Sequence, residues 1–278
     1  MIDSSWRPKV VILCGGQGTR LREETEFKPK PLVEIGGLPI LWHIMKLYDT
    51  NGMRDFVLCL GYKGRMIKEF FMDYEWDTFD FSMNLREKEH IWHRTHEVEN
   101  WNVTFANTGE RTLTAGRIKR IERYIPQDDP FFLLTYGDGV SDVDIRAVIE
   151  HHKRSGKLVT ITGVHPQGKY GIVDTDDEGN VRSFLEKPPG DDFINGGFMV
   201  VDRTVFSMIT ADDQAFEADI LPVLAKRGQV ALYPHVGFWH SMDTHKDFTD
   251  LNALWDLGAP WKIWKDHQPR LRPSGPRL

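Results

Sequence analysis

The sequence predicts an α/β fold with a mostly parallel central sheet. Over the first 165 residues, short apolar runs typical of buried strands alternate with amphipathic stretches typical of helices. This alternation is the pattern of βαβ units, whose strands lie parallel and are covered by helices. At 278 residues, with 40% hydrophobic and 27% charged residues, the chain has the composition of a globular protein with a sizeable core.

The first half supplies most of the expected elements. The expected strands are 10–13, 56–60, 103–107, 131–136 and 159–164, and the expected helices are 39–51, 63–74, 117–125 and 142–154. Residues 77–102 are polar and aromatic without a clear period, which indicates an insertion or an extended loop.

Beyond residue 165 the pattern changes to short strands separated by turns. Strands are expected at 171–174, 181–186, 197–201 and 230–233, with a hairpin turn at 176–180 and a helix at 246–257. These segments indicate a small β-rich region added to the first half. We expect one domain over 8–264, with halves at 8–165 and 166–264 and a flexible Pro- and Arg-rich tail at 265–278.

Charge and composition exclude several classes of protein. The net charge of -6 argues against a nucleic acid polymer as partner, because such binding needs an extended basic surface. No apolar run approaches the roughly 18 residues that span a membrane, and residues 1–9 lack the apolar middle of a signal peptide. Cys14 and Cys59 lie in apolar runs, which favours buried free thiols. We expect a cytoplasmic protein without a membrane partner.

A glycine-rich turn follows the first strand and predicts a phosphate-binding loop. Backbone N–H groups from Gly15 to Thr19 can close around a phosphate, and the basic residue Arg20 follows at once. Lys28 and Lys30 come next in a Lys-Pro-Lys-Pro run, which the prolines keep extended. The alternative is an ordinary connection between a strand and a helix, which the adjacent cations disfavour.

Two common phosphate loops do not fit this stretch. The dinucleotide-binding fingerprint requires a third small residue, and Leu21 holds that position. A P-loop requires Ser or Thr after Gly-Lys, and Leu158 follows Gly156 and Lys157.

Two aspartates are candidate metal ligands. Asp138 stands in a Gly-Asp-Gly turn after a buried strand, and Asp243 lies between a strand-like run and a helix. Mg²⁺ usually takes one or two carboxylates together with substrate phosphate oxygens. Each aspartate has an alternative role as the N-cap of the helix that follows it. The histidines lack zinc-site spacing, and no nucleophile stands beside a base.

Several motifs together resemble one enzyme family, the sugar-1-phosphate nucleotidyltransferases. They are Gly-Gly-Gln-Gly-Thr-Arg-Leu, Lys-Pro-Lys-Pro-Leu, Gly-Asp-Gly, Glu-Lys-Pro, Asn-Gly-Gly-Phe and Met-Asp-Thr, in that order. Residues 23–25, 40–46, 61–64 and 237–239 are similar to the cytidylyltransferase branch that acts on glucose 1-phosphate. The likeness extends from about residue 8 to residue 264. Cys14 stands where the family usually has alanine, and residues 165–171 differ from the family's sugar-side loop.

The resemblance implies a Rossmann-like nucleotidyltransferase fold with a small β-rich sugar-binding region. It also implies Mg²⁺ as cofactor, and transfer of a cytidylyl group from CTP to glucose 1-phosphate with release of pyrophosphate. The family is often oligomeric, so a homo-oligomer is expected, with the insertion near 77–102 at subunit contacts.

The resemblance also assigns roles to particular positions. Arg20 and Lys30 would be the catalytic cations, and Asp138 and Asp243 would hold the metal. The nucleotide-binding residues would be Leu13, Gly15, Gly16, Gly18, Thr19, Thr108, Gly109, Thr114, Gly116, Arg117 and Gly137. The residues binding the sugar phosphate would be Tyr136, Gly171, Glu186, Lys187 and Asn195.

Two alternatives remain open at the level of sequence. One is the same chemistry with UTP or dTTP, or with another sugar 1-phosphate, because no residue pattern reveals the choice of base. The other is a non-catalytic sensor of sugar nucleotides. The joint presence of Lys30, Asp138 and Asp243 argues against the sensor, since a binding protein needs no complete set of metal and leaving-group residues.

Overall fold

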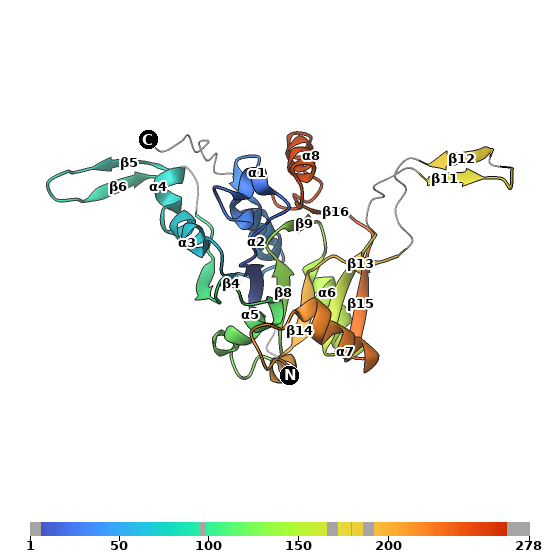
Figure 1. The fold of residues 1–278 in the computed structure, drawn as a ribbon. Helices are drawn as coiled ribbons and strands as arrows, with labels where there is room; N and C mark the ends of the chain where they lie inside the picture. Colours follow the sequence, from blue (N-terminus) through green and yellow to red (C-terminus); the bar gives the residue numbers. More distant parts are fainter. Residues whose placement is uncertain (1–6, 95–97, 166–171, 179, 186–191, 266–278) are drawn as a thin grey trace.

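One mixed sheet forms the centre of the molecule (Figure 1). The computed structural model describes residues 7–94, 98–165, 172–178, 180–185 and 192–265. Across the sheet, β7 pairs with β4, β4 with β1, β1 with β8, β8 with β14, and β14 with β10, while β13 and β15 also pair with β10. The strands are β1 (Val10–Cys14), β4 (Asp55–Leu60), β7 (Asn102–Asn107), β8 (Phe131–Tyr136), β10 (Val159–Val164), β13 (Ile194–Asn195), β14 (Met199–Asp202) and β15 (Val230–His235).

The sheet is mostly parallel, as predicted. Val10 of β1 is in register with Phe56 of β4 on one side and with Leu133 of β8 on the other, and both pairings are parallel. β14 runs antiparallel to both of its neighbours, β8 and β10. Strand β1 therefore lies at the centre of the sheet, between neighbours that come from different parts of the chain.

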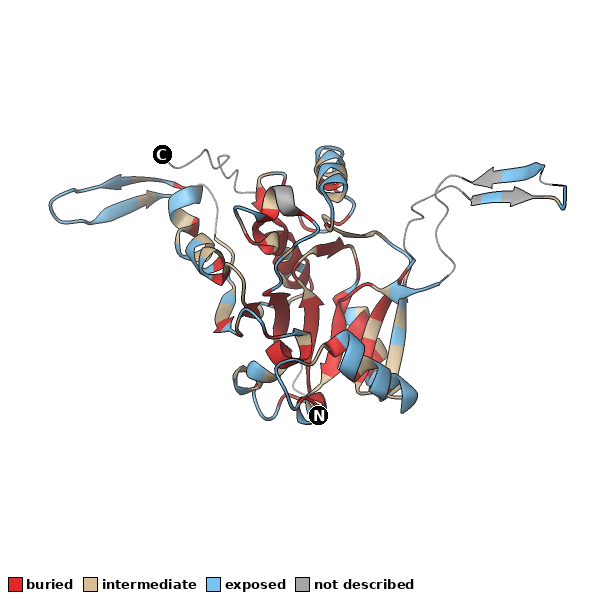
Figure 2. Cartoon of the chain, in the orientation of Figure 1, coloured by how far each residue is buried: buried red, intermediate tan, exposed pale blue. Residues whose placement is uncertain are grey.

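Helices cover both faces of the sheet, which explains why its central strands are apolar throughout (Figure 2). Side chains of β1 alternate between two core clusters, with Ile12 in one and Leu13 in the other. The first cluster includes residues of α2 (Ile40–Thr50), α3 (Gly64–Met72), α6 (Ile145–Ser155) and α8 (His245–Asp256). The second includes residues of α5 (Thr114–Arg120) and α7 (Leu221–Lys226).

Shorter elements surround this three-layer core. Two hairpins, β5–β6 and β11–β12, stand away from the sheet on opposite sides in Figure 1. The strands outside the main sheet are β2 (Glu34–Ile35), β3 (Leu38–Pro39), β5 (Asp80–Met83), β6 (His90–His93), β9 (Gly139–Ser141), β11 (Ile172–Thr175), β12 (Val181–Leu185) and β16 (Trp239–Ser241). The remaining helical turns are α1 (Arg22–Thr25), η1 (Lys30–Leu32), α4 (Tyr74–Thr78), η2 (Glu122–Tyr124), η3 (Arg203–Met208) and the π-helical η4 (Phe216–Ile220).

Most predicted elements are confirmed, and three segments differ in an informative way. Residues 77–102 contain the β5–β6 hairpin. The helix predicted at 117–125 begins earlier, at Thr114, because the carbonyl oxygens of residues 212 and 214 accept the N–H groups at its start. Its predicted last residues form the separate η2 turn. Strands β13, β14 and β15 extend the central sheet, so among the described strands of the second half only β11, β12 and β16 lie outside it.

Both cysteines are buried and free, as predicted. Within the described ranges, no helix is both long and apolar enough to cross a membrane.

Candidate active site

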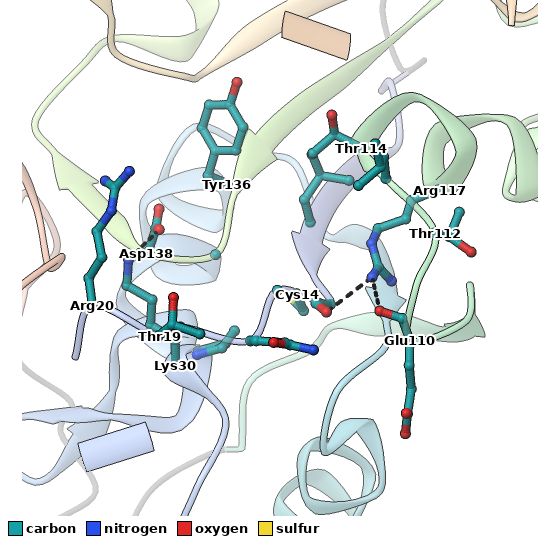
Figure 3. Close-up of a pocket in the computed structure, with 18 of the residues that line it drawn as sticks. Cys14, Thr19, Arg20, Lys30, Glu110, Thr112, Thr114, Arg117, Tyr136 and Asp138 are labelled. Atoms are coloured by element: carbon teal, nitrogen blue, oxygen red, sulfur yellow. Dashed lines mark hydrogen bonds and ion pairs between the residues drawn. The ribbon is translucent and has the colours of Figure 1, made fainter. Parts of the chain in front are cut away.

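A pocket of about 610 Å³ opens where β1 and β8 end (Figure 3). The chain leaves β1 to form β4 on one side and later returns to form β8 on the other. At such a point of a parallel sheet, the loops after the two strands diverge and leave a crevice beyond the carboxyl ends. The loop after β1, from Gly15 to Arg20, and the turn at Gly137 and Asp138 after β8 both line this pocket.

Most of the predicted site residues line the same pocket. Those that do are Leu13, Gly15, Gly16, Gly18, Thr19, Arg20, Lys30, Thr114, Arg117, Tyr136, Gly137, Asp138 and Asp243. Seven lining residues were not singled out from the sequence, namely Cys14, Gln17, Pro31, Glu110, Arg111, Thr112 and Leu113. Five of the seven adjoin a predicted residue along the chain, and Arg111 and Thr112 lie between the predicted residues Gly109 and Thr114. The available signal was therefore their neighbourhood and not their residue type.

Lys30 joins the two candidate metal ligands. Its Nζ donates to Asp138 Oδ2 and to Asp243 Oδ1, each at 2.7 Å. The lysine side chain is only 12% exposed. Burial alone would lower the pKa of Lys30, but the charges and hydrogen bonds of the two carboxylates outweigh it and raise that pKa. Three segments far apart in the sequence thus place one cation between two anions at the edge of the pocket.

Neither aspartate caps a helix. Asp144 is the N-cap of α6, where its carboxylate accepts the N–H of Ala147. Thr244 is the N-cap of α8 and forms a capping box with Asp247. The carboxylate of Asp243 instead accepts from Lys30 and, at 2.9 Å, from Ser241 Oγ. The N-cap alternative is therefore excluded for Asp138 and for Asp243.

The two carboxylates fit a hard divalent cation. They already hold a cationic group between them, and carboxylate oxygens are the protein ligands that Mg²⁺ prefers. Across the part of the chain that the structure describes, no three His, Cys, Asp or Glu side chains gather closely enough to hold a metal ion by themselves. Oxygens from a substrate would have to complete the coordination at this position.

Arg117 braces the opposite wall of the pocket (Figure 3). The side chain is buried, and its terminal nitrogens donate to the hydroxyl of Thr108 and to the carbonyl oxygens of Gly15, Leu60, Gly109 and Glu110. A side chain at position 15 would collide with the guanidinium, which would then have to move away from these partners. Arg117 therefore ties the loop after β1 to the end of β4 and to the loop after β7.

Four predicted residues lie outside the lining of the pocket. Thr108 is fully buried and donates to the carbonyl of Leu60, and Gly109 follows it. A Cβ at Gly116 would meet the carbonyl oxygen of Asp212 at 2.5 Å, so this glycine permits close backbone packing. Asn195 donates to the hydroxyl of Tyr136 at 3.2 Å and thus reaches the pocket through that ring. The predicted residues Gly171, Glu186 and Lys187 lie outside the described residues.

The sequence matches a known family along most of its length. The nucleotidyl transferase family matches residues 9–256. The chain is 49% identical over 259 residues to the glucose-1-phosphate cytidylyltransferases of Salmonella typhi and Salmonella typhimurium, which covers 92% of the chain and 100% of each relative.

Solved structures agree with this match. HddC from Yersinia pseudotuberculosis is 25% identical to the chain, with a TM-score of 0.64 and coverage of 90% of this chain and 100% of that one. A second structure of HddC, complexed with GMP-PN, gives a TM-score of 0.65. The chain therefore belongs to the nucleotidyl transferase family, as a member of its glucose-1-phosphate cytidylyltransferase branch.

Proposed function

We propose that this enzyme transfers a cytidylyl group from CTP to glucose 1-phosphate and releases pyrophosphate, with Mg²⁺ as cofactor. The observation that carries the proposal is the meeting of Lys30 with Asp138 and Asp243 beside the glycine loop. This arrangement offers a metal-binding pair and a fixed cation next to a phosphate-binding loop, which are the parts that nucleotidyl transfer requires. The substrates follow those of the Salmonella relatives.

The chain's own groups act by placement and charge. The loop from Gly15 to Thr19 directs backbone N–H groups at the nucleotide phosphates. Arg20 lines the pocket and is exposed, so it is free to meet a phosphate of the leaving group together with Lys30. Asp138 and Asp243 would hold Mg²⁺, which supplies charge neutralisation on the phosphates.

The reaction needs no general base. A phosphate monoester has a second pKa near 6, so glucose 1-phosphate is already mostly a dianion at pH 7. Its oxygen attacks the α-phosphorus and the bond to pyrophosphate breaks, with no proton to remove. The obstacle is repulsion between anions, which is what the cations around the pocket reduce. Glu186, Lys187, Gly171 and Asn195 are proposed to hold the sugar phosphate in line.

We place this chemistry in one domain over residues 8–264, with the nucleotide in the 8–165 half and the sugar in the 166–264 half. The proposed location is the cytoplasm, a reducing compartment in which free thiols such as Cys14 and Cys59 persist. A homo-oligomer is proposed as the working form, with contacts through the β5–β6 hairpin.

Measurement of pyrophosphate release across nucleotides and sugar phosphates tests the proposal. We expect the highest kcat/KM with CTP and glucose 1-phosphate. CTP presents an N4 amine where UTP presents a carbonyl oxygen, and a site that hydrogen-bonds one group rejects the other because its own polar groups stay unpaired. An equal or higher kcat/KM with UTP or dTTP would refute the choice of base. No release with any pair would refute the activity itself.

A further inference from the structure

Glu217 bridges two residues that line the pocket and come from different elements. Its Oε1 accepts the hydroxyl proton of Tyr136 at 2.7 Å, and its Oε2 accepts that of Thr114 at 2.6 Å. Tyr136 ends β8, and Thr114 begins α5. Glu217 is not one of the residues that line the pocket. Glu217 is exposed, and it contacts the pocket lining through these two hydroxyl groups.

The segment that carries Glu217 is fixed against α5. The N–H groups of Leu113 and Ala115 donate to the carbonyl oxygens of Asp212 and Gln214, at 2.9 and 3.1 Å. The N–H of Phe216 donates to the hydroxyl of Thr114 at 2.8 Å. Glu217 then follows in the π-helical turn Phe216–Ile220, whose two end residues are buried. This docking determines where the Glu217 carboxylate lies.

The hydrogen bonds around Glu217 have a defined direction. Burial, together with the charge of Glu217, raises the pKa of Tyr136, so its phenol stays protonated and donates to the carboxylate. The phenol oxygen in turn accepts from Asn195 Nδ2, and Asn195 Oδ1 accepts the N–H of Gly197 at 3.0 Å. The orientation of the Asn195 amide is thereby set by Glu217 through Tyr136.

We propose that Glu217 is a positioning residue that fixes the distance between the nucleotide side and the sugar side of the site. Thr114 belongs to the wall that also carries Arg117, and Tyr136 with Asn195 belongs to the proposed sugar side. The inference rests on the proposed function, because only a reaction between two bound substrates requires such a fixed distance. Misplacement of reacting groups by about 1 Å is enough to lower a rate about a hundredfold.

The test compares Glu217→Ala and Glu217→Gln with wild type. We expect Glu217→Ala to lower kcat about tenfold or more, while the Kd of the nucleotide measured alone by calorimetry changes less than about threefold. The kcat of Glu217→Gln should fall between those of Glu217→Ala and wild type. Its amide oxygen still accepts one hydroxyl group, while its NH₂ group leaves the other hydroxyl without an acceptor. The matched control is Glu150→Gln, which removes the same charge from an exposed pair with Lys153 on α6 and should behave as wild type.

A double-mutant cycle with Tyr136→Phe separates positioning from a general loss of structure. If Glu217 acts through Tyr136, the effects of Glu217→Gln and Tyr136→Phe on kcat combine to less than their product. Independent effects would overturn the proposal, as would a kcat of Glu217→Gln within about twofold of wild type or an equal loss of nucleotide affinity. If melting curves show that Glu217→Ala is unfolded, the Gln variant and the cycle decide. Wild-type activity in the same assay tests the proposed function separately.

Discussion

At the scale of single residues, Lys30 is the key to the site. Its ammonium lies between carboxylates that come from positions 108 and 213 residues further along the chain. A partly buried cation with two anionic partners is held in one place, since loss of either partner leaves charge uncompensated away from water. Lys30 thereby keeps Asp138 and Asp243 facing the pocket.

We predict that Asp138→Asn and Asp243→Asn each lower kcat at least about a hundredfold, because an amide is a weaker ligand for a cation that neutralises phosphate charge. Turnover at saturating Mg²⁺ and Mg²⁺ binding by calorimetry are the measurements, with circular dichroism to show that the fold persists. The control is Asp250→Asn, on α8, whose side chain is 42% exposed and pairs with Lys246. Near wild-type turnover in either site variant would remove that aspartate from the metal site.

The sequence reveals some of these residues and hides others. The glycine loop and the aspartate after β8 follow from local patterns, because a phosphate loop and a turn are each built from adjacent residues. Arg117 and Glu217 depend on distant partners. Gly15 lies 102 residues from Arg117, and Thr114 lies 103 residues from Glu217. No spacing rule connects such positions, so only the folded chain shows them.

At the scale of elements, the β5–β6 hairpin is a separate two-stranded sheet that stands away from the main sheet (Figure 1). Phe81 and Trp92 pair across it and pack with Trp76, which gives the hairpin a small aromatic core of its own. Leu85 and Ile91 remain 81% and 68% exposed. Exposed apolar side chains on a hairpin are unfavourable in a monomer and are typical of a contact surface between proteins. The proposed oligomer therefore uses this hairpin.

We predict that a double substitution, Leu85→Ser with Ile91→Ser, shifts the protein toward the monomer. Each large side chain contributes about 1.5 to 3 kcal/mol when it is fully buried at a contact, so removal of two weakens the assembly strongly. Light scattering after size-exclusion chromatography gives the mass. Val236→Ser, at a residue 92% exposed elsewhere, should leave the mass unchanged. A wild-type protein that is monomeric at micromolar concentration would contradict the oligomer.

At the scale of the whole molecule, the end of the described chain is packed onto an early helix. Trp261 and Trp264 lie against His43 of α2, and Trp261 Nε1 donates to His43 Nδ1 at 3.4 Å. His43 Nε2 must then carry the ring proton, since it lies 2.9 Å from the carbonyl oxygen of Ile35, which only accepts. The ring is buried and uncharged, and burial lowers its pKa from 6.5 to about 4.

Because the pKa of His43 is lowered, we predict that the folded protein loses stability in mild acid. Between pH 6.5 and 4 the unfolded chain binds a proton at His43 that the folded chain does not, so the free energy of unfolding falls as pH falls. The stabilisation from the neutral His43 ring is fully present above pH 6.5. The loss of this stabilisation amounts to at most about 3 kcal/mol by pH 4. Urea unfolding at several pH values measures it. His43→Gln should be less stable at neutral pH yet lose less on acidification, and an unchanged pH slope would exclude His43 as the cause.

The order of the sheet was only partly predictable from the sequence. Alternating apolar and amphipathic runs predict parallel strands because each run is local. Nothing local indicates that β14 enters between β8 and β10 in the opposite direction, since that choice depends on which edge of the sheet is still unpaired. The sequence thus predicts a change of pattern near residue 165, whereas the joining of strands from both sides of that point into one sheet is a property of the folded chain.

The central place of β1 has a consequence for the order in which the protein is made. A ribosome releases residues 10–14 early, and β4 then supplies one neighbour after about forty more residues. The other edge of β1, with Val10 to Leu13 opposite residues 133–136, stays open until β8 has been synthesised. An apolar strand with an unpaired edge is a template for association with other chains. In nascent chains of this enzyme, the apolar edge of β1 therefore stays open to such association until residue 136 has left the ribosomal tunnel.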